Sequence, residues 1–168
     1  MGDSMKKLWL LLALPIIAID QWVKWWADTS LLGDYGAVSV SKPFIPGVEL
    51  TYAQNTGAAF SLLSGGGARW FLTAVSTLAV VLIIIAVFKR WVGSLFGVIS
   101  VSCVLGGAVG NLIDRAVQGY VVDMFAFTFI DFAIFNVADV FITVGGVCFA
   151  LSAILEGRKK NAPVDENG

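Results

Sequence analysis

Two aspartates are candidates for acid and base chemistry, Asp123 in "VVDMF" and Asp139 in "FNVAD". They flank an apolar stretch that is interrupted by Thr128, Asp131 and Asn136. An ionised aspartate within a membrane span costs roughly 2.5 to 3.5 kcal/mol, so such residues usually have a function. If the stretch folds back and the two carboxylates meet in a partly dry site, one of them keeps a proton. The pair could then hydrolyse an amide as general base and general acid, or each could be an interfacial carboxylate with its own Arg or Asn partner.

Other catalytic chemistries have few candidate residues in this chain. There is no histidine, which excludes Ser–His and Cys–His nucleophile pairs and all His-based metal sites. Cys103 and Cys148 both lie in apolar runs, and no CxxC pair is present. We therefore expect no metal and no cofactor. The net charge of −1, without a basic cluster, also argues against a nucleic-acid partner.

Amide side chains accompany the two aspartates. Asn136 comes three residues before Asp139, so on a helix both would face the same way, and its amide could bind a substrate carbonyl or hold a carboxylate. Asn55 lies in "NTGAAF" beside Gly57, where a turn residue is the simpler interpretation.

Two further polar groups are found at the ends of apolar segments. "GNLIDR" ends one such segment with Asn111, Asp114 and Arg115, which could be a helix end satisfied by local hydrogen bonds. Asp20 and Lys24 are four residues apart, a spacing that predicts an ion pair on one helical face.

The composition predicts an α-helical integral membrane protein. Hydrophobic residues make up 58% of the chain, charged residues 14%, and the mean hydropathy is +0.84. About 20 apolar residues suffice to cross a bilayer. Four spans are predicted, at about 8–27, 70–88, 94–113 and 137–155. A cleaved signal peptide is the alternative for the first, since Lys6 and Lys7 precede an uncharged run, although the apolar pattern continues through a group of tryptophans.

The connecting segments complete a single domain over residues 1–168. Lys and Arg are richer on the side of both termini, which predicts that both termini are cytoplasmic. Apolar and polar residues alternate in parts of the segment 36–64, which also contains prolines and glycines. This pattern predicts a small outer β-structure. Residues 114–136 are expected to form an outer loop or short helix, and residues 158–168 a polar tail. Gly106 and Gly110, four residues apart, predict close helix packing.

Five fragments in this order resemble the bacterial lipoprotein signal peptidases, signal peptidase II, the aspartyl peptidase family A8. They are "DQWVK", "NTGAAF", "GNLIDR", "VVDM" and "FNVAD". The resemblance extends over almost the whole chain. The chain departs from the family pattern at Val23, where Ser or Thr is frequent, and at Met124, where Phe is frequent. The change at Met124 would alter the shape of the wall of the substrate pocket.

The resemblance implies an intramembrane aspartyl endopeptidase with four transmembrane helices, an extracytoplasmic β-cradle and a short outer helix. Members remove the signal peptide of a prolipoprotein before its diacylglyceryl-modified cysteine and are inhibited by globomycin. Carried over by motif, Asp123 and Asp139 would be the catalytic pair. Substrate-site and supporting positions would be Asn55, Asn111, Arg115 and Asn136, with Asp20, Lys24 and Asp114.

The resemblance also implies a cellular setting. The chain would lie in the bacterial cytoplasmic (inner) membrane, with its site near the outer leaflet, where the acyl chains of the substrate are held. We expect a monomer that contacts membrane lipid and the lipidated substrate.

Two other classes of protein compete with this interpretation. In a small proton- or cation-coupled transporter, membrane carboxylates would be ion sites, but these should lie near mid-span, whereas the carboxylates here lie at span ends or outside. In a non-catalytic membrane partner the glycine pairs would be the main feature, and the outer polar cluster would have no explanation.

Overall fold

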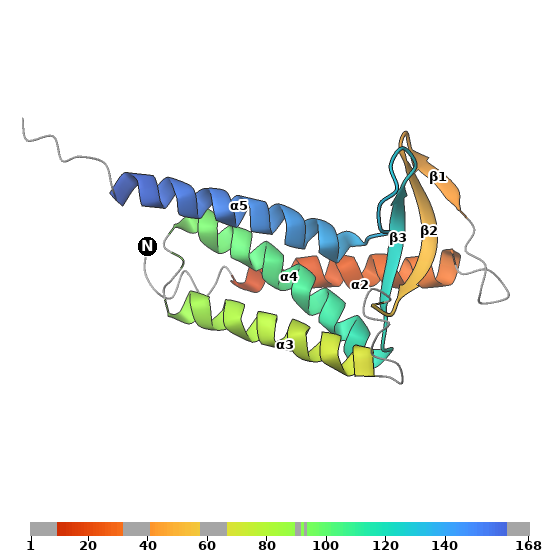
Figure 1. Ribbon diagram of the computed structural model, residues 1–168, viewed down its shortest axis with the longest axis horizontal. Helices are drawn as coiled ribbons and strands as arrows, with labels where there is room; N and C mark the ends of the chain where they lie inside the picture. Colours follow the sequence, from red (N-terminus) through yellow and green to blue (C-terminus); the bar gives the residue numbers. More distant parts are fainter. Residues whose placement is uncertain (1–9, 32–40, 58–66, 90–91, 93, 161–168) are drawn as a thin grey trace, which may run out of the picture.

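The computed structural model describes residues 10–31, 41–57, 67–89, 92 and 94–160. Four long helices lie side by side, and a small sheet stands across one end of them (Figure 1). The helices are α2 (Ala13–Ser30), α3 (Gly67–Phe88), α4 (Leu95–Val117) and α5 (Val137–Lys160), and a short 3₁₀ turn, η1 (Leu10–Leu12), precedes α2. The strands are β1 (Lys42–Ile45), β2 (Val48–Asn55) and β3 (Val121–Phe127).

Three helices in the described ranges are long and apolar enough to cross a membrane: Trp70–Phe88, Leu95–Val117 and Val137–Gly157. They agree with the predicted second, third and fourth spans, and α5 continues to Lys160. The first predicted span corresponds to η1 and α2, and α2 carries three charged residues, Asp20, Lys24 and Asp28. A fourth crossing therefore stays a prediction.

The sheet is antiparallel, in the order β1–β2–β3. β1 and β2 form a hairpin that turns at Gly47, whose φ of 86° favours glycine. They lie inside the predicted segment 36–64, of which residues 36–40 and 58–64 are outside the described part. β3 was not predicted as a strand: it pairs with β2 from Asn55 opposite Val121 to Val48 opposite Phe127. The expectation of a separate helix within residues 114–136 is wrong, because α4 ends at Val117, β3 follows, and residues 128–136 contain no helix.

Small residues on α4 let two of its neighbouring helices, α2 and α5, approach closely. A Cβ atom at Gly106 would meet Ile16 of α2 at 2.8 Å, and one at Gly110 would overlap Asp20, which is also on α2. Gly107 faces the other way, against the backbone of Ala138 at the start of α5. The predicted close packing around Gly106 and Gly110 is thus present, and Gly107 extends it to a third helix.

The C-terminal end of α2 is attached to the sheet. Ala27 and Leu31 pack with Tyr52, Val122 and Met124 in a buried apolar cluster. The hydroxyl of Tyr52 also donates to the Asp28 carboxylate at 2.8 Å. These contacts hold β2 and β3 in place, and so the side chains that project from their ends.

Candidate active site

The two aspartates predicted as a pair come from different elements and are brought to the same place. Asp123 lies on β3 and is buried, whereas Asp139 lies in the first turn of α5 and is half-buried. One residue, Asn136, connects them through its side chain and its backbone. The amide of Asn136 donates to Asp123 Oδ1 at 2.6 Å, and the backbone N–H of Asn136 donates to Asp139 Oδ2 at 3.2 Å.

Asn136 and Asp139 also begin helix α5. The backbone N–H of Asp139 donates to Asn136 Oδ1 at 3.0 Å, which completes a reciprocal pair of bonds between the residue before the helix and its third residue. This is the geometry of a capping box, with Asp139 in the place that Glu or Gln usually takes. A helix N-terminus favours a negative charge, so the capping box suits an ionised Asp139. Asn136 therefore contacts Asp139 as a cap and not as a neighbour within the helix.

Two more amides complete the surroundings of the carboxylates. Asn55, the last residue of β2, donates to Asp123 Oδ2 at 3.0 Å, and its own Oδ1 accepts from the backbone of Gly57. Asn111 of α4 donates to Asp139 Oδ1 at 2.9 Å. All four carboxylate oxygens of the pair thus accept a hydrogen bond from an amide.

The surroundings of Asp123 change the pKa of its carboxyl group. Burial raises the pKa of Asp123 to about 6, the hydrogen bond from Asn55 opposes this shift, and the nearby charge of Asp139 adds to it. The hydrogen bond from Asn136 and the charge of Lys24 also favour the ionised form. Desolvation is the largest of these effects, so Asp123 holds a proton more readily than a free aspartate does.

A buried charge cluster lies directly behind the pair. Lys24 Nζ contacts Asp20 Oδ2 at 2.8 Å and Asp114 Oδ2 at 3.0 Å. The predicted Asp20–Lys24 ion pair is therefore confirmed, with Asp114 as a second partner. Asp20 Oδ1 also accepts from the backbone of Ala138 at 2.8 Å, and Asp114 Oδ2 from the backbone of Val122 at 3.2 Å. The cluster ties α2 and α4 to the residues that adjoin Asp139 and Asp123.

Arg115, on α4 like Asn111, is half-buried. Its Nη1 donates to Ser76 Oγ at 3.3 Å and to the backbone of Asn111 at 3.4 Å. Its buried Nε has no hydrogen-bond partner among the described residues. The structure therefore brings Arg115 beside Asn111, but no hydrogen bond in the described part joins it to either aspartate.

Gln21 was not predicted, although it lies within the "DQWVK" fragment. Its amide donates to Asp114 Oδ1 at 2.8 Å and to the backbone of Gly110 at 3.2 Å. Its place between Asp20 and Lys24 was the only signal in the sequence.

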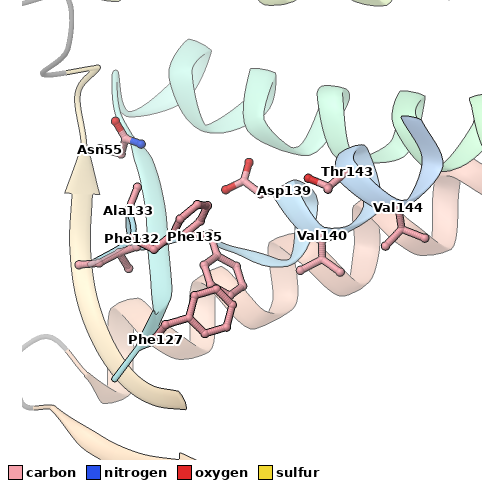
Figure 2. Close-up of a pocket in the computed structure, with 10 residues that line it drawn as sticks. Asn55, Phe127, Phe132, Ala133, Phe135, Asp139, Val140, Thr143 and Val144 are labelled. Atoms are coloured by element: carbon pink, nitrogen blue, oxygen red, sulfur yellow. The ribbon is translucent and has the colours of Figure 1, made fainter. Parts of the chain in front are cut away.

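An apolar cavity of about 470 Å³ opens beside Asp139 (Figure 2). Asp139 and Asn55 supply polar groups to its lining. Phenyl rings and the first two turns of α5 supply most of the rest. The remaining lining residues are Phe127, Phe132, Ala133, Ile134, Phe135, Val140, Thr143 and Val144. The aromatic residues among them were not singled out from the sequence, because their clustering depends on how the segment after β3 folds back towards α5.

The described residues contain no group of three or more His, Cys, Asp or Glu side chains placed to hold a metal ion. What the arrangement offers is a pair of amide-bound carboxylates, one of which, Asp139, lines an apolar cavity, in a bundle whose described part has three helices apolar enough to cross a membrane. This combination is typical of a membrane-embedded protein with aspartic acid–base chemistry.

Comparison with known proteins agrees with that class. The family model described as Signal peptidase (SPase) II matches residues 12–155. A lipoprotein signal peptidase of Brevibacillus brevis is 42% identical over 150 residues, which cover 89% of this chain and 96% of the relative. A lipoprotein signal peptidase of Enterococcus faecalis is 37% identical over 162 residues, covering 96% and 95%.

Solved structures are similar as well. One structure of a bacterial membrane enzyme superposes with a TM-score of 0.77 at 28% identity, covering 88% of this chain and 93% of the other. A second gives a TM-score of 0.76 at 26% identity, covering 95% and 94%. The chain belongs to the signal peptidase II family, which consists of aspartic peptidases.

Proposed function

We propose that this chain removes the signal peptide of prolipoproteins within the membrane, with Asp123 and Asp139 as its catalytic pair and a cut before the diacylglyceryl-modified cysteine. The observation that carries the proposal is the bridge made by Asn136, which contacts both carboxylates. Family membership supports the substrate class and favours a peptidase over a transporter.

The two carboxylates are suited to different tasks. Both carboxylates accept hydrogen bonds on both oxygens, but Asp139 also lies at a helix N-terminus, so in the proposal it is the ionised base that deprotonates the attacking water. Asp123 is the acid: its proton hydrogen-bonds the scissile carbonyl oxygen as the tetrahedral intermediate forms. Bond cleavage then requires that a proton reach the leaving amine, and Asp139, which carries the proton taken from water, can give it.

The apolar cavity supports a lipid-modified substrate. Its phenyl rings and the exposed valines of α5 offer a surface for the acyl chains and apolar signal peptide, while Asp139 and Asn55 reach the peptide bond. In the proposal α2 is a fourth span, both termini are cytoplasmic, and the sheet lies at the outer face of the inner membrane. The enzyme works as a monomer and binds globomycin at this site.

Cleavage of a purified diacylglyceryl-modified prolipoprotein, followed by the shift of the product on a gel, tests the function. We expect cleavage by the purified full chain, dependence on the lipid modification, and inhibition by globomycin. Absence of cleavage in a protein that purifies as a folded, monodisperse species would contradict the proposal.

The pH profile of this reaction is expected to fall on its alkaline side near pH 6. The pKa of Asp123 is raised to about 6, so its acid form is abundant below this pH and is lost as the pH rises through it. Measuring kcat/KM between pH 4.5 and 8.5 checks the expectation. A rate that rises through pH 6 would instead make Asp123 the base.

Asn55→Ala gives the profile an internal test. The hydrogen bond from Asn55 lowers the pKa of Asp123, so its removal should move the alkaline limb to higher pH. The exposed neighbour Gln54, whose amide bonds the Tyr52 hydroxyl, provides the control Gln54→Ala, in which the limb should stay in place.

A further inference from the structure

The buried ammonium of Lys24 has three acceptors for its three N–H groups. Two are the carboxylates of Asp20 and Asp114, and the third is Asn111 Oδ1 at 2.8 Å. Charge neutralisation requires only the carboxylates. The contact with Asn111 is therefore a separate feature, and it points towards the site, because Asn111 also bonds Asp139.

The orientation of the Asn111 amide follows from groups that can only donate. Asn111 Oδ1 accepts from Lys24 and, at 3.1 Å, from the Asn136 amide. The Asn136 amide is itself oriented by the backbone N–H of Asp139, which donates to Asn136 Oδ1. A rotated Asn111 would place its NH₂ group against both donors, leaving buried polar groups unpaired.

We propose that Lys24 is a positioning residue of the peptidase, whose bond to Asn111 Oδ1 keeps the Asn111 NH₂ group directed at Asp139. Through that NH₂ group at 2.9 Å, Lys24 fixes the carboxylate of Asp139 relative to Asp123. The inference rests on the proposed function, since it concerns the same site. It goes beyond an ion pair, because it predicts an effect on turnover that neutralisation of the carboxylates would not produce.

Lys24→Met tests this inference. Without the ammonium, Asn111 can rotate, and Asp139 loses a fixed donor. Misplacement of a reacting group by about 1 Å can cost on the order of 100-fold, and we expect a fall in kcat of about that size with KM changed less than about threefold. A control is Gln21→Leu, which removes bonds to Asp20, Asp114 and Gly110 in the same cluster and leaves the Lys24–Asn111 contact. Its kcat should stay within about threefold of the wild type.

A double-mutant cycle with Asn111→Ala separates positioning from general destabilisation. If Lys24 acts through Asn111, Lys24→Met should change kcat by less than about threefold once Asn111 is alanine. A further loss of about 100-fold in that background would overturn the inference. So would a Lys24→Met enzyme with unchanged kcat, or one in which only KM rises.

A second variant covers the case in which Lys24→Met does not fold. Lys24→Met leaves Asp20 and Asp114 without their cation, which can prevent folding. Monodispersity and thermal melting identify that case, and Lys24→Met/Asp114→Asn is then compared with Asp114→Asn alone under the same criteria. The failures are also distinguishable: a wild type that cleaves nothing contradicts the proposed function, whereas an active wild type with an unaffected Lys24→Met contradicts only the inference.

Discussion

Asp123→Asn and Asp139→Asn are each expected to lower the cleavage rate by on the order of 1,000-fold or more while the protein still inserts and purifies. Asparagine has almost the shape of aspartate, but it can neither accept a proton from water nor supply one to a carbonyl. General acid–base groups contribute about 10² to 10⁴ each, and each replacement removes one of the two proposed here. The measurement is the initial rate on purified diacylglyceryl-modified prolipoprotein.

Asp131→Asn is the matched control for both variants. Asp131 lies between the two residues in the sequence, is exposed, and does not line the cavity. We expect it to cleave at the wild-type rate. Full activity in either Asp123→Asn or Asp139→Asn would exclude that residue from the catalytic pair, and an equal loss in Asp131→Asn would show that any loss of charge in this region is harmful.

Gly107→Ala is expected to give the largest loss among substitutions outside the site. A Cβ at residue 107 would overlap the backbone carbonyl of Ala138, and a backbone atom cannot move aside as a side-chain tip can. Helices α4 and α5 would have to separate next to Asp139, which lengthens its bond to Asn111. Overpacking of this kind costs about 1 to 3 kcal/mol, so we expect a lower melting temperature together with a cleavage rate reduced at least about tenfold.

Gly146→Ala is the matched control on α5. A Cβ at this position meets no atom within 4 Å, so the substitution adds a methyl group without a clash. We expect an unchanged or higher melting temperature, because alanine is the better helix former, and an unchanged rate. Equal behaviour of the two variants would mean that contact at Gly107 does not limit the distance between α4 and α5.

The sequence was sufficient to predict which polar residues lie together, but not the way in which they are connected or which aromatic residues line the cavity beside them. Asp123 and Asp139 were found because carboxylates are rare in so apolar a chain, and Asp20 and Lys24 because four residues form one helical turn. The bridge through Asn136 could not be found in this way. On an assumed helix Asn136 would face the same way as Asp139, whereas in the structure it caps α5 and so can contact both aspartates.

The β3 strand shows a second limit of sequence reasoning. Residues 121–127 read "VVDMFAF". In an apolar run this short, the spacing of hydrophobic residues does not distinguish a strand from a helix. What makes it a strand is pairing with β2, more than 60 residues earlier, with Ala53 opposite Asp123. Non-local pairing is set by tertiary structure, and so a loop or a short helix was the natural expectation for part of this segment.

The capping box at the start of α5 has a consequence for the biogenesis of the enzyme. Asp139 is held by the turn that begins α5, the last helix of the described part, and the adjacent Ala138 is bound by Asp20 of α2, which is synthesised long before α5. A nascent chain that ends before α5 therefore has Asp123 and Asn136 but lacks Asp139, the second carboxylate of the proposed pair. If Asp123 and Asp139 are the catalytic pair, cleavage of membrane substrates should begin only when α5 has joined the other helices.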